Sequence, residues 1–321
     1  MKWVSLERNI NDFTVSRQTL TLLQPSHSNY NNMTIIENEV LKVEVSSNGA
    51  ELQSILNTVT GINYLWNGNP AFWAKRSPVL FPIIGNLKKN TYYYQGKSYQ
   101  LPRHGFARDM EFQVEKQSPK EVTMLLRSNP ETKSNYPFDF EFRIRYQVQG
   151  DELSTEYLVT NTGSGMLIFS VGGHPAFRLP LTADTKFEDY YLKFEENENL
   201  SRWPISGEGL IQMEPIPVLE DTNRLNLKKS LFYQDALVFK YPASSEISLI
   251  SGKTPHGILF QMGEFPFLGI WSSKDADFIC IEPWCGIADS VNSDQQLEHK
   301  EGMEKTAPGK VFSRQWRIKV F

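Results

Sequence analysis

The stretch Phe138-Asp-Phe-Glu-Phe-Arg-Ile-Arg-Tyr-Gln-Val148 alternates apolar and polar side chains without exception. A period of two is typical of a β-strand with one buried face and one face in water. Weaker forms of the pattern recur along the chain, mostly bounded by Gly, Pro or Asn. They predict further strands over 40–45, 92–101, 121–127, 153–159, 167–171, 246–250, 258–262, 278–282 and 315–321.

Helical periodicity is rare, and only 69–75 and 184–190 look locally helical. Many antiparallel strands in 321 residues predict an all-β fold, a large antiparallel β-sandwich, because two sheets can bury their apolar faces against each other. Closure into a barrel is the alternative. We expect one domain over 33–321, preceded at 1–32 by a polar, poorly ordered N-terminal extension that lacks alternation.

The composition excludes several classes of protein. Lysine and arginine number 33 against 37 acidic residues, and no basic run exceeds a pair, so we expect no nucleic-acid partner. The apolar runs are strand-sized, which predicts no membrane span. Cys280 and Cys285 are too few for a disulfide scaffold and lack zinc-finger spacing. Charges at Glu7, Arg8 and Asp12 interrupt any signal peptide, so we expect a cytoplasmic location.

The sequence has no P-loop, no dinucleotide fingerprint, no H-E-x-x-H and no G-x-S-x-G. Two histidines stand out instead. His104 is followed by glycine directly after a predicted strand, and His174 lies between two glycines and a proline. Such surroundings fix the backbone and can aim a side chain into a cleft. For each histidine alone, a structural role in a turn is the alternative.

A carboxylate, Glu282, is the third candidate group after the two histidines. Alternation places Glu282 in line with Phe278 and Cys280 at the end of a predicted strand, where burial would raise its pKa toward neutrality. A buried ion pair with an arginine is the alternative for Glu282, and a core position is the alternative for Trp284. Together, two histidines and a carboxylate predict a metal-free acid/base site.

At this point the chain resembles the aldose 1-epimerase (galactose mutarotase-like) family, in its LacX-type bacterial branch, from about Met33 to the C-terminus. The resemblance implies the β-supersandwich of the mutarotases. It rests on Glu37–Val43 with Asn48–Leu52, on Arg76–Gly85, on His104–Arg108, on Gly172–Phe177, on Asp235–Phe239, and on Phe267–Ser272 with Ile281–Gly286.

The resemblance also implies roles for single residues. Glu282 matches the general base that takes the proton of the C1 hydroxyl, and His174 matches the acid that protonates the ring oxygen. His104 matches the second histidine, near the ring oxygen or C1. Arg76 and Asp235 match contacts to substrate hydroxyls, and Trp284 is a candidate for stacking on the sugar. No cofactor and no metal are implied.

The expected activity is interconversion of the α and β anomers of a free aldohexose, a small-molecule sugar substrate, by a monomer or homodimer. One departure concerns the substrate. Well-studied members carry Asn-x-x-His-Gly-Gly, whereas His104 is followed here by Gly-Phe-Ala-Arg. Arg103, Arg108 and Arg178 beside the histidine motifs therefore leave a hexose-6-phosphate 1-epimerase as an alternative. A non-catalytic carbohydrate-binding protein on the same fold is the second alternative function.

Overall fold

The computed structural model describes Met1 and residues 33–321, so the extension predicted for 1–32 lies, apart from Met1, outside the described residues. Strands dominate the described part. They are β1 (Met33–Glu37), β2 (Leu41–Ser46), β3 (Leu52–Asn57), β4 (Val79–Leu80), β5 (Thr91–Tyr94), β6 (Lys97–Gln100), β7 (Gln113–Ser118), β8 (Glu121–Arg127), β9 (Phe140–Gln149), β10 (Glu152–Asn161), β11 (Leu167–Phe169), β12 (Val171–Gly173), β13 (Ala176–Arg178), β14 (Tyr190–Arg202), β15 (Ile216–Asn226), β16 (Leu237–Lys240), β17 (Glu246–Ser251), β18 (Thr254–Gln261), β19 (Phe267–Trp271), β20 (Phe278–Cys285), β21 (Glu304–Thr306) and β22 (Val311–Val320).

Helices are few and short in residues 33–321. The α-helix α1 spans Pro130–Asn135, and the 3₁₀ turns are η1 (Lys88–Asn90), η2 (Ala107–Asp109), η3 (Phe187–Asp189), η4 (Lys229–Phe232) and η5 (Leu297–His299). None of these helices has the length and apolar character needed to cross a bilayer.

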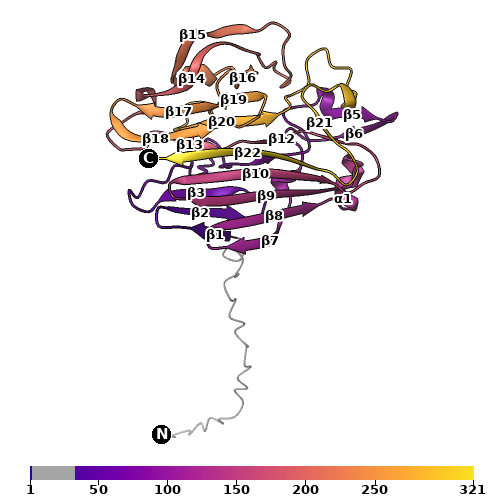
Figure 1. The fold of residues 1–321 in the computed structure, drawn as a ribbon, viewed down its shortest axis with the longest axis horizontal. Coiled ribbons are helices and arrows are strands. Elements are labelled where there is room, and N and C mark those ends of the chain that lie inside the picture. Colours follow the sequence, from indigo (N-terminus) through magenta and orange to yellow (C-terminus); the bar gives the residue numbers. More distant parts are fainter. Residues whose placement is uncertain (2–32) are drawn as a thin grey trace. The chain divides into compact units, whose positions relative to one another are not determined.

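The largest sheet has nine strands in the order β15-β14-β17-β18-β22-β10-β9-β8-β7. Figure 1 shows β22, near the C-terminus, between β18 and β10. On β9 the burial alternates as the sequence predicts, with Phe140, Phe142, Ile144, Tyr146 and Val148 buried and the residues between them more exposed.

A second sheet has six strands, with β16-β19-β20-β12-β4 in order and β13 also paired to β20. Its inner face packs on the nine-stranded sheet. Phe81, just after β4, stacks on Phe142 of β9 with ring centroids 4.6 Å apart, and Phe177 of β13 meets Phe260 of β18 at 6.1 Å. All pairs between these strands are antiparallel. The prediction of an all-β antiparallel sandwich is confirmed.

Some local predictions are wrong. Residues 69–75 form a turn in which Asn69 accepts hydrogen bonds from the backbone of Ala71, Phe72 and Trp73, so the helix expected there does not form. The second region expected to be helical holds only the short η3 before β14 begins. Helix α1 was not predicted, although Asn129 and Thr132 form a capping box around its first turn.

Candidate active site

Strand β20 is buried along its whole length, and side chains on its two faces belong to different clusters of buried residues. Ile279 and Ile281 belong to the core between the two large sheets. Cys280 and Trp284 belong to two smaller clusters, apart from that core. Glu282 lines the cavity described below together with Trp284, and only 1% of it is exposed. The strand alternation therefore places a carboxyl group in an apolar setting at the bottom of a cavity.

His174 follows β12, which lies beside β20 in the same sheet. Its position depends on Gly173, because a Cβ at that residue would lie 2.7 Å from the hydroxyl oxygen of Tyr157 in the facing sheet. The His174 backbone N–H donates to the carbonyl of Pro78 at 3.1 Å. The imidazole Nε2 then lies 3.2 Å from Oε2 of Glu282, and 8% of His174 is exposed.

His104 is held in a left-handed turn, with φ of 68° at His104 and 72° at Gly105. Two hydrogen bonds join it to Gly85: its backbone N–H donates to the Gly85 carbonyl at 3.0 Å, and the Gly85 N–H donates to Nδ1 at 3.1 Å. Arg103 Nε also lies 3.2 Å from Nε2. A neutral imidazole accepts at one nitrogen only, and the backbone donor is the fixed one. The Gly85 N–H therefore fixes Nδ1 as the acceptor, and the contact of Nε2 with the Arg103 side chain is the one that can rearrange when a ligand binds.

Burial sets the protonation of the pair. Desolvation, helped by Arg103, lowers the pKa of His174 to about 3. Desolvation raises the pKa of the Glu282 carboxyl well above its ordinary value, although Arg103 opposes the shift. Each group thus favours its uncharged form, so that Glu282 keeps its proton and His174 stays neutral, with Nε2 and Oε2 3.2 Å apart. Desolvation also keeps the pKa of His104 well below its usual range.

These groups meet in a cavity of about 390 Å³, within the size range of small-ligand sites. Aromatic rings surround His174, with Trp73 at 5.0 Å and Trp271 at 5.5 Å between ring centroids. The lining consists of Trp73, Ile84, Gly85, Arg103, His104, Arg108, His174, Ile205, Gly209, Ile211, Asp235, Ala236, Val238, Trp271, Glu282, Trp284 and Ala288.

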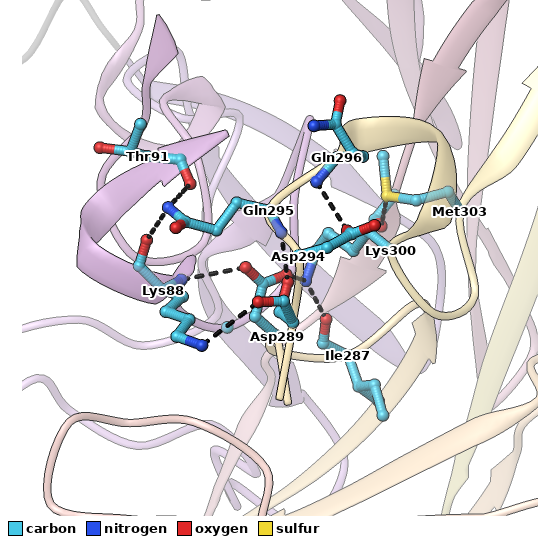
Figure 2. Close-up of polar contacts among 12 residues, drawn as sticks. Lys88, Thr91, Ile287, Asp289, Asp294, Gln295, Gln296, Lys300 and Met303 are labelled. Carbon is cyan, nitrogen blue, oxygen red and sulfur yellow. Dashed lines mark hydrogen bonds and ion pairs between the residues drawn. The ribbon is translucent and has the colours of Figure 1, made fainter. Parts of the chain in front are cut away.

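Figure 2 shows a buried ion pair between Asp289 and Lys300. Next to the lining residue Ala288, Asp289 accepts from Lys300 Nζ at 3.1 Å and from the Lys88 backbone N–H at 3.0 Å. Lys300 also donates to the carbonyl of Ile287 at 2.5 Å. Both partners of the pair are satisfied, so the wall is held rigidly.

Among the six candidates from the sequence, His104, His174, Asp235, Glu282 and Trp284 line this cavity. Arg76 does not. Its guanidinium donates to the carbonyl of Gln53 at 2.7 Å, and its backbone N–H donates to the buried carboxylate of Glu51 at 2.6 Å. The structure thus places Arg76 in a local network beside the site.

Four other residues also line the cavity: Arg103 and Arg108, on which the phosphate alternative rests, and Trp73 and Trp271, which the sequence did not indicate. Arg103 Nη2 lies 3.7 Å from Asp235 Oδ1, and Nε of Arg108 is buried without a hydrogen-bond partner. The arginines flank the His104 motif, so their position in the sequence was a usable signal. Trp73 lies in the segment misread as helical.

The described residues hold one group of potential metal ligands, His174, Cys280 and Glu282, whose donor atoms lie within 4.8 Å of one another. Two of the three already form the proton-sharing pair. Both cysteines are free and buried, as expected from the sequence.

The described residues thus form an antiparallel β-sandwich with a buried imidazole and a buried carboxyl group side by side in one cavity. The family model for aldose 1-epimerase matches residues 32–306, and the chain belongs to that family. It is 34% identical over 300 residues to the protein LacX (chromosomal) of Lactococcus lactis subsp. lactis, covering 90% of this chain and 99% of that one.

Two solved structures are also similar. A galactose mutarotase related enzyme from Lactobacillus acidophilus has a TM-score of 0.86 and 36% identity, covering 90% of this chain and 97% of that chain. A galactose mutarotase-like protein from Lactobacillus casei has a TM-score of 0.85 and 32% identity, covering 90% and 100%. The family resemblance found in the sequence is confirmed.

Proposed function

We propose that the protein is an aldose 1-epimerase that interconverts the α and β anomers of a free aldohexose. The observation that carries the proposal is the contact between His174 Nε2 and Glu282 Oε2, which lie 3.2 Å apart and line a cavity of sugar size. Anomerisation requires one group that accepts a proton and one that donates it, and a positioned pair supplies both.

In this scheme the proton of the Glu282 carboxyl first moves to His174, which leaves Glu282 as the carboxylate. Glu282 accepts the proton of the C1 hydroxyl while His174 donates its proton to the ring oxygen. The electron pair of the O1–H bond forms the C1=O1 carbonyl, and the bond between C1 and the ring oxygen breaks. Rotation about C1–C2 exposes the other face of the aldehyde, and reclosure returns both protons, so the pair is regenerated.

Other lining residues orient the sugar in this scheme. His104, whose Nε2 lies 3.2 Å from Arg103 Nε, lines the cavity beside His174 and can contact the ring oxygen or a hydroxyl near C1. Asp235 and Arg103, at the cavity wall, bind hydroxyls, and Arg103 takes the place that the resemblance gave to Arg76. Trp284 offers an apolar face of the kind on which sugars pack.

The direct test measures anomer exchange of glucose and galactose by NMR or polarimetry above the uncatalysed rate. Glu282→Gln and His174→Asn should each lower kcat by roughly 10²- to 10⁴-fold, the usual worth of a positioned acid or base. Binding should persist in both variants. If the wild-type protein binds these sugars without accelerating exchange, the non-catalytic carbohydrate-binding alternative takes the place of this proposal.

Because only proton transfers are needed, chelation with EDTA should leave the rate unchanged. A rate lost on chelation and restored by one divalent ion would move His174, Cys280 and Glu282 from an acid/base site to a metal site.

One observation favours a second candidate, a hexose-6-phosphate 1-epimerase. Two arginines, Arg103 and Arg108, line the cavity, and the buried Nε of Arg108 makes no hydrogen bond, with Asp109 Oδ2 3.7 Å away. Guanidinium groups are strong binders of phosphate. Arg178, the third arginine near the histidine motifs, donates instead to the Leu181 carbonyl at 2.6 Å and does not line the cavity.

The arginines supply a matched comparison. If the phosphate is the substrate, kcat/KM for glucose 6-phosphate exceeds that for glucose, Arg108→Ala removes the excess, and Arg178→Ala does not. A free aldohexose as substrate predicts no such excess. We favour the free sugar because Arg103 already faces Asp235.

A further inference from the structure

Cys280 is a buried thiol that the proposed reaction does not use. Alternation along β20 places its side chain on the same face of the strand as Glu282, whereas Ile279 and Ile281 face the core between the two large sheets. The donor atoms of Cys280, His174 and Glu282 lie within 4.8 Å of one another. A thiol, an imidazole and a carboxyl group therefore converge beside the active-site cavity.

Two polar atoms of this group lack a hydrogen-bond partner within the part of the chain that the structure describes. They are Nδ1 of His174 and Oε2 of Glu282, on side chains that are almost fully buried. Oε2 is also the carboxyl oxygen that lies 3.2 Å from Nε2 of His174. A buried polar atom without a partner is costly, so such an atom is available to a ligand.

The combination of sulfur, nitrogen and oxygen donors suits Zn²⁺ and similar soft divalent cations, whereas Mg²⁺ and Ca²⁺ prefer oxygen alone. Zn²⁺ binds thiolate sulfur at about 2.3 Å, imidazole nitrogen at about 2.0 Å and carboxylate oxygen at about 2.1 Å, in a tetrahedron whose corners are thus about 3.4–3.6 Å apart. The contact between His174 and Glu282 is already close to that spacing. Cys280 Sγ needs to approach by only about 1 Å.

The charges also balance. When Zn²⁺ binds, the thiol proton of Cys280 and the carboxyl proton of Glu282 leave to solvent, and thiolate, carboxylate and cation sum to zero. A neutral complex is compatible with the apolar cluster to which Cys280 belongs, which includes Trp66 and Phe278. His174 and Glu282 line the cavity, so the cation can enter from there and keep its fourth position for a water molecule.

We propose that His174, Cys280 and Glu282 form a binding site for Zn²⁺ or a similar soft divalent cation, and that the bound cation inhibits the enzyme. The cation would occupy the group that accepts the proton of the sugar and the group that donates one, so neither transfer could take place. The binding site stands on the three ligands alone, and the inhibition rests on the proposed function.

The binding experiment uses Co²⁺ as the probe, because Co²⁺ occupies tetrahedral zinc sites and a thiolate bound to it absorbs in the near ultraviolet. The reduced, metal-free full chain should bind one equivalent of Co²⁺ with this thiolate band, and Zn²⁺ should displace it. Cys280→Ala should lose the band. The matched control is Cys285→Ala, on the same strand but in the core between the large sheets, which should keep it.

His174→Asn should weaken Zn²⁺ binding by about a hundredfold or more, since even the loss of a residue that only supports a ligand costs roughly 10- to 100-fold. Circular dichroism checks that each variant is folded, and Cys280→Ser repeats the test if the alanine variant is not. The site is refuted by a wild-type protein without the thiolate band, by a band that survives loss of the Cys280 thiol, or by unchanged Zn²⁺ affinity in His174→Asn.

The inhibition experiment measures anomer exchange of glucose and galactose with added Zn²⁺. Zn²⁺ should slow the wild-type protein and EDTA should restore its rate. Cys280→Ala should keep the metal-free rate and need about a hundredfold more Zn²⁺ for half-inhibition. Equal inhibition of both proteins would overturn the inhibitory role of the site. A chain that exchanges no sugar contradicts the proposed function instead, and the Co²⁺ spectrum still tests the binding site.

Discussion

At the scale of single residues, the contact between His174 and Glu282 behaves as a unit that holds one proton. A second proton enters only as the pH approaches the lowered pKa of His174, about 3. The shared proton leaves only above the raised pKa of Glu282. The pair is therefore in its one-proton state throughout the mildly acid range.

The first prediction concerns pH. We expect the profile of kcat/KM for the aldose to show no acid limb near the ordinary histidine pKa of about 6.5, because the pKa of His174 is lowered to about 3. The alkaline limb reports loss of the shared proton. NMR exchange rates at a series of pH values measure the profile. An acid limb centred near the ordinary histidine value would contradict the lowered pKa.

The second prediction concerns stability. The folded-state pKa of Glu282 is raised, so folding loses free energy as the pH rises above about 4.3, where the unfolded carboxyl ionises. Glu282→Gln removes that penalty while lowering kcat as stated above. The variant should melt a few degrees above the wild-type protein at neutral pH, with the difference vanishing below about pH 4.

Glu220→Gln, on the exposed side of β15, is the control and should leave the melting temperature unchanged at every pH. A lower melting temperature for Glu282→Gln at neutral pH would mean that the carboxylate stabilises the fold through its contacts. Calorimetry of the wild-type protein and the two variants decides whether the Glu282 carboxyl group destabilises or stabilises the fold.

The candidate residues differ in how far the sequence could identify them. His104 and His174 have glycine and proline neighbours, which fix the backbone locally, and Glu282 follows from strand alternation. These signals lie within a few residues. Local sequence signals could not show that Arg103 lines the cavity and Arg76 does not. Glu51 and Gln53, which hold Arg76 beside the site, lie on a distant segment.

At the scale of elements, the indole of Trp284 on β20 packs over Gly269 on the neighbouring strand β19. Gly269 pairs with Glu282 across the two strands, and a Cβ at Gly269 would lie 2.4 Å from Cη2 of Trp284. The indole packs over a position that has no side chain. Gly269 therefore determines the position of the Trp284 indole, which lines the cavity.

The third prediction follows from this packing. Gly269→Ala should push the Trp284 indole toward the cavity and lower kcat/KM by about tenfold to a hundredfold, with a loss of stability of about 1–3 kcal/mol from overpacking. Gly252→Ala, between β17 and β18 where an added Cβ meets open space, is the control. Full activity in Gly269→Ala would show that the position of Trp284 is not critical.

Strands with regular alternation, such as β9, were predictable, whereas β14 was not. Register shifts between Lys193 and Leu200 interrupt its pairing with β15, and bulges break the period of two on which a sequence pattern depends. Helix α1 was missed for a different reason. Its six residues are too short for helical periodicity, and only its capping box marks it.

At the scale of the whole molecule, the fourth prediction concerns the first 32 residues. If the folded domain begins at Met33, deletion of residues 1–32 should leave both the unfolding midpoint and the anomerisation rate nearly unchanged, since such an arm buries little apolar surface. Calorimetry and NMR exchange on the shortened chain measure both. A drop of several degrees would show that Trp3, Phe13 or Leu20 packs on the sandwich.

The place of β22 has a consequence for synthesis of the protein. Residues 113–161 supply β7 to β10, and residues 190–261 supply β14, β15, β17 and β18, so two half-sheets are complete long before β22 is made. Until residues 311–320 emerge, β10 and β18 are both unpaired edges, the kind of surface that joins chains to one another. The nascent chain would thus expose two unpaired sheet edges, and β22 pairs with both of them when it is added.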